Sequence, residues 1–271
     1  MNIITLTSDY GLKDPYMGIW KGSIFRLNAM AKVVDISHSI APANFLEAAY
    51  VLGSAYAYFP KGSVHVIAIE EMDAQSMRFV AMKKDGHFFV APDNGILSLI
   101  RPEYTIESIH LIDIEPNDKE FPATEIMTKA ALFLAEGGAI NVLGQACADM
   151  HTISPWKPLF NQQSKLLTTH IVYVDRRGNL VTNLNRKTFN SYLGNQTFVI
   201  HLPAGTRISR ITNSFREIRQ EAVIFALFNH NELLEIGVNG GSFKASTGAS
   251  HLLGLSLQDT ITIEFTWLYA S

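Results

Sequence analysis

Short apolar runs alternate with helical patterns along the first half of the chain. Each run is bounded by turn or charged residues, which is typical of buried strands, and such strands are predicted at 2–8, 32–36 and 63–69. The stretches 14–27 and 43–58 carry apolar residues near helical spacing. Alternation of strand and helix predicts parallel pairing in a sheet that helices cover on both faces.

A hairpin interrupts this alternation. The apolar runs 78–83 and 87–90 flank a turn signal at 84–86, whose Gly86 tolerates positive φ, so part of the sheet is expected to be antiparallel. A strand at 108–114 and a helix at 124–136 follow. Residues 1–150 are therefore predicted to form an α/β domain with a mostly parallel sheet.

The helical period largely disappears in the second half of the chain. We place a linker at 151–164, in a stretch that mixes Pro, Ser and Gln without clear periodicity. Strands are then predicted at 170–175, 180–184, 197–202, 222–229, 233–238 and 260–266. Short strands with recurring turns indicate an all-β, small barrel-like domain over residues 165–271.

Composition restricts the partners. The 271 residues carry a formal net charge of -3 without a run of Lys or Arg, which argues against nucleic acid or a membrane as partner and favours a small molecule. Cys147 is the only cysteine, as is typical of a reducing compartment such as the cytoplasm. The nine histidines include no His-x-x-His pair, so no catalytic metal is predicted. No window reaches the roughly 20 apolar residues of a membrane-spanning helix, and no signal peptide is indicated.

The segment from Thr7 to Asp14 carries the most suggestive chemistry. It leaves the first predicted strand and enters a helix, and ligands in α/β sheets bind beyond the carboxyl ends of strands. A carboxylate such as Asp9 can accept both hydroxyls of a ribose at that place. Helix capping is the competing interpretation for Asp14. No Gly-x-Gly-x-x-Gly fingerprint follows the strand, so pyrophosphate binding is not predicted.

Three further polar clusters lie at predicted turns. The segment 91–95 is a strong turn signal, and a purely structural turn is the alternative to a site. The segment 175–183 offers the amides of Asn179 and Asn183 to a purine edge, or forms only a hairpin turn. In the segment 229–241, two polar turns bracket one strand.

Taken together and in order, these segments resemble the S-adenosylmethionine (SAM) hydroxide adenosyltransferase family, which also contains fluorinating and chlorinating enzymes. The resemblance runs through segments 7–14, 21–22, 34–40, 58–66, 91–95, 175–183 and 234–241. It implies an α/β domain, a barrel-like domain and a homotrimer whose ligand contacts the first domain of one subunit and the second domain of a neighbour. It also implies SAM as substrate or ligand, without a cofactor.

The resemblance implies roles for single residues. Asp9 resembles the ligand of the ribose hydroxyls, and Asp14 and Asp175 resemble contacts to the methionine portion. Asn179 and the backbone at Gly240 resemble the ligands of the adenine edge.

The chain departs from the family pattern at the methionine end of the expected ligand. His230 and Asn231 stand where the halogenating members place a Ser-Arg pair for the methionine carboxylate. A carboxylate without a bidentate guanidinium needs other donors.

The reaction centre departs further. The family reaction is an in-line displacement at the ribose 5′ carbon, in which water or a halide attacks and neutral methionine leaves, so the protein positions and activates the nucleophile. The hydrolases use an Asp-Arg-His set for this task. Here Glu70 replaces the Asp, Met77 replaces the first of two arginines, and Pro122 replaces the His. Arg78 remains as the second arginine, and Glu70, Asp73 and Arg78 are the candidate catalytic residues.

Several interpretations remain open. Water activated by Glu70 or Asp73 gives adenosine and methionine, whereas a pseudoenzyme binds SAM or adenosine as a sensor without turnover; a different nucleophile or nucleoside is a third possibility. Halogenation is least favoured, because Asp73 falls near the halide-binding position and like charges about 4 Å apart repel by several kcal/mol. A solvated acidic loop at 70–73 and an assembly scaffold are the structural alternatives.

Overall fold

The chain folds into two compact units. The computed structural model describes residues 2–70, 77–218, 223–239 and 248–267. The units are Met1–Ser154 and Pro155–Ser271, and the division falls within the predicted linker segment 151–164.

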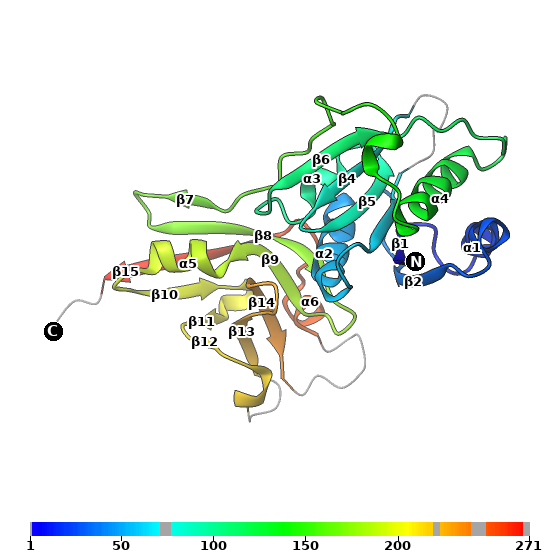
Figure 1. Ribbon diagram of the computed structural model, residues 1–271. Coiled ribbons are helices and arrows are strands. Elements are labelled where there is room, and N and C mark those ends of the chain that lie inside the picture. Colours follow the sequence, from blue (N-terminus) through cyan, green and yellow to red (C-terminus); the bar gives the residue numbers. More distant parts are fainter. Residues whose placement is uncertain (1, 71–76, 219–222, 240–247, 268–271) are drawn as a thin grey trace. The chain divides into compact units, whose positions relative to one another are not determined.

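The N-terminal unit is built on a six-stranded mixed sheet with the order β2-β1-β3-β5-β4-β6 (Figure 1). Its strands are β1 (Ile3–Ser8), β2 (Lys32–Ser37), β3 (Val64–Ala68), β4 (Phe79–Lys84), β5 (His87–Pro92) and β6 (Ile106–Leu111). β1 pairs in parallel with β2 and β3, and β3 pairs in parallel with β5, whereas β4 is antiparallel to both β5 and β6. The parallel centre and the antiparallel hairpin are both confirmed. Because β1, β2, β3 and β5 run in one direction, their carboxyl ends meet at the same edge of the sheet.

Helices pack on both faces of this sheet. They are α1 (Tyr16–Leu27), α2 (Phe45–Ala55), α3 (Ile96–Leu99) and α4 (Pro122–Ala135), with the 3₁₀ turns η1 (Tyr56–Tyr58) and η2 (Ile140–Val142). Alternate residues of a strand point to opposite faces, so Val64 and Val66 pack in one core with α1 and α4. Ile67 and Ile69 pack in a second core with α2 and α3. Burial on both faces explains why β3 is an almost continuous apolar run.

Two histidines are buried beside the second core. His65 Nδ1 lies 2.7 Å from Thr5 Oγ1, and His65 Nε2 lies 3.2 Å from His87 Nδ1. The ring of Tyr56 packs edge-on against both imidazoles. Burial and the neighbouring His87 lower the pKa of His65 to about 3, and burial also lowers the pKa of His87. His65 is therefore held neutral well below the pH at which an exposed histidine gains a proton.

The C-terminal unit is a barrel-like sheet with the order β11-β10-β15-β8-β9-β14-β13-β12 (Figure 1). Its strands are β7 (Leu159–Asn161), β8 (Leu166–Val174), β9 (Leu180–Asn185), β10 (Gln196–His201), β11 (Arg207–Ile208), β12 (Ile211–Thr212), β13 (Ile224–Phe228), β14 (Leu233–Val238) and β15 (Thr260–Trp267). Among the described strands of this unit, β7 pairs only with β8, and every pairing is antiparallel except that of β12 with β13. The predicted β architecture of this half is confirmed.

Short helical segments also occur in this unit. They are α5 (Arg186–Leu193), α6 (Ala249–Leu253), η3 (Pro203–Gly205) and η4 (Phe215–Glu217). The apolar pattern did not predict α5, because only Phe189 of its eight residues is buried. Asn185 caps this helix by accepting a hydrogen bond from the backbone N–H of Thr188 at 2.8 Å.

Candidate functional site

Acidic and amide side chains gather where the parallel strands of the N-terminal unit end. Asp9 follows β1 directly, Glu70 follows β3 by two residues, and Asp93 and Asn94 follow β5. The parallel pairing places these positions at one edge of the sheet, where ligands of α/β folds bind.

The Asp9 carboxylate is held by backbone donors. Its Oδ2 accepts hydrogen bonds from the N–H of Ala43 at 3.0 Å and of Glu70 at 3.3 Å. Both donors have left-handed backbone, with φ of 56° at Ala43 and 50° at Glu70, which costs a non-glycine residue about 1 kcal/mol or more. Asp9 Oδ1 makes no hydrogen bond to any residue that the structure describes. A carboxylate has about four acceptor positions, so two remain for a ligand.

Glu70 and its neighbours form the rest of this edge. The Glu70 side chain is exposed, and the carbonyl of Ile69 before it accepts a hydrogen bond from Asn94 Nδ2 at 2.8 Å. The segment 91–95 is thus a turn that also anchors the Glu70 loop. Asp73, the other candidate for water activation, lies outside the described residues.

The capping interpretation of Asp14 is wrong. Helix α1 begins at Tyr16, and its N-cap position is Pro15, which makes no side-chain capping hydrogen bond. Asp14 lies one residue earlier with an exposed side chain. Its predicted contact to methionine stays a prediction.

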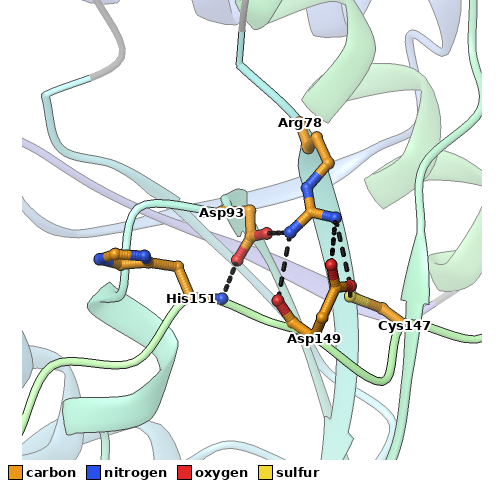
Figure 2. Close-up of polar contacts among 5 residues, drawn as sticks. All are labelled: Arg78, Asp93, Cys147, Asp149 and His151. Carbon is orange, nitrogen blue, oxygen red and sulfur yellow. Dashed lines mark hydrogen bonds and ion pairs between the residues drawn. The ribbon is translucent and has the colours of Figure 1, made fainter.

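Arg78 is the centre of a salt-bridge cluster at the start of β4 (Figure 2). Its Nη1 donates to both carboxylate oxygens of Asp149 at 3.2 and 3.1 Å, and its Nη2 donates to Asp93 Oδ2 at 2.5 Å. The hydrogen bond from Arg78 holds the pKa of Asp149 below its usual range. Asp93 Oδ1 accepts from the backbone N–H of His151 at 2.8 Å, and Cys147 Sγ lies 3.6 Å from Asp149 Oδ1. The guanidinium therefore joins the loop after β5 to the segment 147–151.

In the C-terminal unit, Asp175 organises the β8–β9 turn. Its Oδ1 accepts from the backbone N–H groups of Arg177 and Asn179, both at 2.8 Å, and its Oδ2 accepts from Asn179 Nδ2 at 3.0 Å. Gly178 has φ of 79° and lies against Gly248, so a side chain there meets backbone. The hairpin turn is confirmed, and it fixes the amide of Asn179 within it.

Glu235 is a polar core residue that the sequence analysis missed. It is buried and accepts a hydrogen bond from Asn229 Nδ2 at 3.1 Å. Burial raises the pKa of its carboxyl, and the hydrogen bond from Asn229 partly opposes this. A glutamate between Leu234 and Ile236, in a strand whose neighbours are buried, was the available signal.

The other predicted ligands of this unit lie at the β13–β14 turn. His230 is exposed, and the N–H of Asn231 donates to Asn229 Oδ1 at 2.9 Å. Asn229 also connects this turn to the buried Glu235 of β14. Gly240 lies outside the described residues.

We expect Gly237→Ala to destabilise the C-terminal unit by about 1–3 kcal/mol, the usual cost of overpacking a core. A Cβ at Gly237 would lie 2.6 Å from the ring of Phe225 and 2.7 Å from Asn179 Oδ1. Asn179 cannot swing away without losing its hydrogen bond to Asp175. Urea unfolding measures the change. Gly22→Ala is the control, because a Cβ there meets open space on a helix and should be neutral or stabilising; equal effects of the two variants would contradict the packing argument.

Metal and membrane features are absent from the described part of the chain. Within residues 2–70, 77–218, 223–239 and 248–267, no three His, Cys, Asp or Glu side chains gather as a metal site. Over the same ranges, no helix has the length and apolar character needed to cross a bilayer.

The fold and these sites define a class of two-unit proteins, in which an α/β unit with acidic groups at its carboxyl edge precedes a barrel-like β unit. Residues 4–144 match the SAM hydroxide adenosyltransferase N-terminal domain, and residues 169–262 match the C-terminal domain of the same family. The chain belongs to this family, which confirms the assignment drawn from the ordered motifs.

Named relatives include both hydrolases and fluorinases. The chain is 29% identical to an (R)-S-adenosyl-L-methionine hydrolase of Methanocaldococcus jannaschii, over 97% of this chain and 96% of that protein. It is 25% identical to a fluorinase of Actinoplanes, over 68% of this chain and 72% of that protein. A crystal structure of an uncharacterized conserved protein from Thermotoga maritima superposes with a TM-score of 0.83 at 25% identity, covering 97% of this chain and all of the other.

Proposed function

We propose that this protein hydrolyses SAM to adenosine and methionine by displacement at the ribose 5′ carbon. The observation that carries the proposal is the Asp9 carboxylate, which two strained backbone segments hold at the carboxyl edge of β1 with one oxygen open to a ligand. The Methanocaldococcus jannaschii hydrolase matches 97% of the chain at 29% identity, whereas the Actinoplanes fluorinase matches 68% at 25% identity. Hydrolysis is therefore favoured over halogenation.

The proposed reaction uses SAM as its substrate and needs no cofactor. A water oxygen bonds to the 5′ carbon as the bond to sulfur breaks, the electron pair stays on sulfur, and the water proton leaves to solvent or to a carboxylate. Asp9 binds the ribose hydroxyls, Asn179 and the backbone at Gly240 bind the adenine edge, and Asp14, Asp175, His230 and Asn231 lie toward the methionine portion. Glu70 and Asp73 are proposed to orient or activate the water.

Arg78 is assigned a supporting role in this proposal. Its Nη1 and Nη2 groups already donate to Asp93 and Asp149, so the side chain secures the loop after β5. We further propose a homotrimer in the cytoplasm, supported by the family resemblance and by the single cysteine. Sedimentation equilibrium of the intact chain tests the trimer.

Hydrolysis in water enriched in ¹⁸O tests the reaction itself. We expect adenosine that carries ¹⁸O in its 5′ hydroxyl, together with unlabelled methionine, because water attacks the ribose carbon. Mass spectrometry of both products measures the label. Absence of any product, or adenosine without the label, would overturn the proposal.

Replacing Glu70 by glutamine is expected to lower turnover about 100-fold or more, the usual contribution of a group that handles the proton of the nucleophile. Adenosine affinity should change little, because the backbone N–H of Glu70 still donates to Asp9. Initial rates of adenosine release measure the effect. Glu103→Gln is the matched control, since Glu103 is exposed and pairs with Arg101. Unchanged turnover in Glu70→Gln would remove Glu70 from the proposed role.

Binding without turnover is the second candidate function, and Pro122 favours it. Pro122 is the first residue of α4 and stands where the family resemblance places a titratable His. A proline cannot take up or release a proton. SAM binding by calorimetry without adenosine or methionine as products would identify a sensor.

A further inference from the structure

A chain of four polar side chains runs beside Asp9 along the ends of β1 and β2. Lys21 Nζ lies 2.5 Å from Asp35 Oδ2, Asp35 Oδ1 lies 3.1 Å from His38 Nε2, and His38 Nδ1 lies 2.7 Å from Ser8 Oγ. Ser8 is the last residue of β1, and His38 directly follows β2. This network reaches the residue before Asp9, and the proposed reaction does not use it.

His38 holds both sides of the turn that carries Asp9. Its ring contacts Ser8, the residue before Asp9, and its carbonyl accepts a hydrogen bond from the N–H of Gly11 at 2.8 Å. Gly11 has φ of 73°, so the chain turns sharply there. Ser8 Oγ also accepts from the N–H of Tyr10 at 3.4 Å. On one side of Asp9, Ser8 therefore contacts the His38 ring, and on the other side Gly11 contacts the His38 carbonyl.

The inner end of this network is buried and the outer end is not. Ser8 is 0% exposed and His38 is 3% exposed, whereas the side chain of Asp35 is 37% exposed. Burial raises the pKa of Asp35, but the hydrogen bond from Lys21 and the neighbouring His38 ring outweigh it and lower the pKa, so Asp35 is ionised at neutral pH. A carboxylate beside Nε2 favours the proton on that nitrogen, which leaves Nδ1 to accept from the Ser8 hydroxyl. The Nε2–H is directed off the line to Asp35 Oδ1, so that contact is chiefly electrostatic.

We propose that His38 is a positioning residue for ribose recognition: through Ser8 and Gly11 it sets the turn from which Asp9 presents its open oxygen to the 2′ and 3′ hydroxyls. The inference rests on the proposed nucleoside-binding function. A purely structural histidine would affect folding and every ligand alike. A positioning histidine affects the part of the affinity that comes from the two hydroxyls.

Two amide variants separate the contacts of the ring. His38→Asn places an amide oxygen near Nδ1, where it can accept from the Ser8 hydroxyl, whereas His38→Gln reaches toward Asp35 and gives up Ser8. Ser8→Ala removes the contact between Ser8 Oγ and His38 Nδ1 by a smaller change, made at the serine. His110→Gln is the matched control, because His110 lies in β6 at the far edge of the sheet and contacts the carbonyl of Gly144.

The experiment is calorimetric titration of each variant with adenosine and with 2′,3′-dideoxyadenosine. The ratio of the two affinities isolates the hydroxyl contribution. We expect His38→Gln and Ser8→Ala to lower this ratio about tenfold, the equivalent of one hydrogen bond to a charged group, while His38→Asn and His110→Gln retain it. Trp20 fluorescence, which reports burial in the same unit, verifies folding of each variant.

The outcomes separate the two proposals. A wild-type protein that prefers adenosine, with the same preference in His38→Gln and Ser8→Ala, would overturn the role of His38 and leave the proposed function standing. A wild-type protein without preference for the hydroxyls would overturn ribose recognition by Asp9, and the role of His38 with it. If His38→Gln does not fold, the ratio of the adenosine and 2′,3′-dideoxyadenosine affinities in Ser8→Ala decides whether the role of His38 stands.

Discussion

Replacing Asp9 by asparagine is expected to weaken adenosine binding about 100-fold or more. Asparagine keeps one oxygen for the backbone N–H groups of Ala43 and Glu70, but its other atom becomes an amide nitrogen that cannot accept from a hydroxyl. Two hydrogen bonds to a charged acceptor contribute about 1.5–3 kcal/mol each, and about 1.4 kcal/mol corresponds to a tenfold change in affinity. Calorimetric titration with adenosine measures the loss.

Asp14→Asn serves as the matched control for this substitution. Asp14 is exposed, lies in the same segment, and is proposed to face the methionine portion of SAM. Adenosine carries no methionine, so its affinity should stay close to that of the unsubstituted protein, whereas SAM affinity should fall. Equal losses in the two variants would show that Asp9 has no particular role in ribose binding.

The position of Asp9 could be predicted because it depends on local rules. When a buried strand is followed by a polar turn and a helix, the turn lies at the carboxyl edge of the parallel sheet. This placement does not depend on distant parts of the chain. The turn at Gly86 was equally local, since a glycine with φ of 71° closes the β4–β5 hairpin. Both features are settled within about 15 residues of sequence.

The partners of Arg78 and Asn179 could not be predicted in this way. Asp149 is 71 positions from Arg78 in the sequence and lies in a segment without periodicity, so only the folded chain brings the two together. Glu235 comes close to Asn179 because β14 pairs with β9. The alternation of apolar residues along each strand does not indicate which residues of two distant strands lie opposite each other. The sequence therefore identifies chemical groups at strand ends better than the side chains that hold them.

The network at His38 shows the same limit. His38 follows a short strand, and nothing in that local pattern indicates its contact to Ser8, 30 positions away. The contact follows from the parallel pairing of β1 with β2, in which Thr7 lies opposite Ser37. The register of β1 with β2 therefore places His38 beside Ser8, where their contact supports the Asp9 turn.

Acidification from pH 6.5 to pH 5 is expected to lower the free energy of unfolding of the N-terminal unit by about 2 kcal/mol through His65 alone. The pKa of His65 is about 3 in the folded chain and 6.5 as an unperturbed side chain, because it is fully buried against His87 and Thr5. Between pH 6.5 and pH 3, the unfolded chain thus binds a proton at His65 that the folded chain does not bind. The stabilisation is fully present above pH 6.5 and is lost as the pH falls toward 3. Urea unfolding followed by Trp20, which is buried in this unit, measures it.

His65→Asn isolates this effect from other titrations. Asparagine can still contact Thr5 but does not titrate, so the variant should be less stable than the unsubstituted chain at neutral pH and lose about 2 kcal/mol less on acidification. The pKa of Glu125, about 2, and the lowered pKa of Asp35 affect stability only at lower pH, because both carboxyls remain ionised in either state above about pH 5. Trp156 and Trp267 belong to the other unit and are already exposed, so they contribute little to the fluorescence change. Equal pH dependence of the two proteins would mean that His65 gains its proton as readily in the folded chain as in the unfolded one, and the buried pair would then have no part in acid stability.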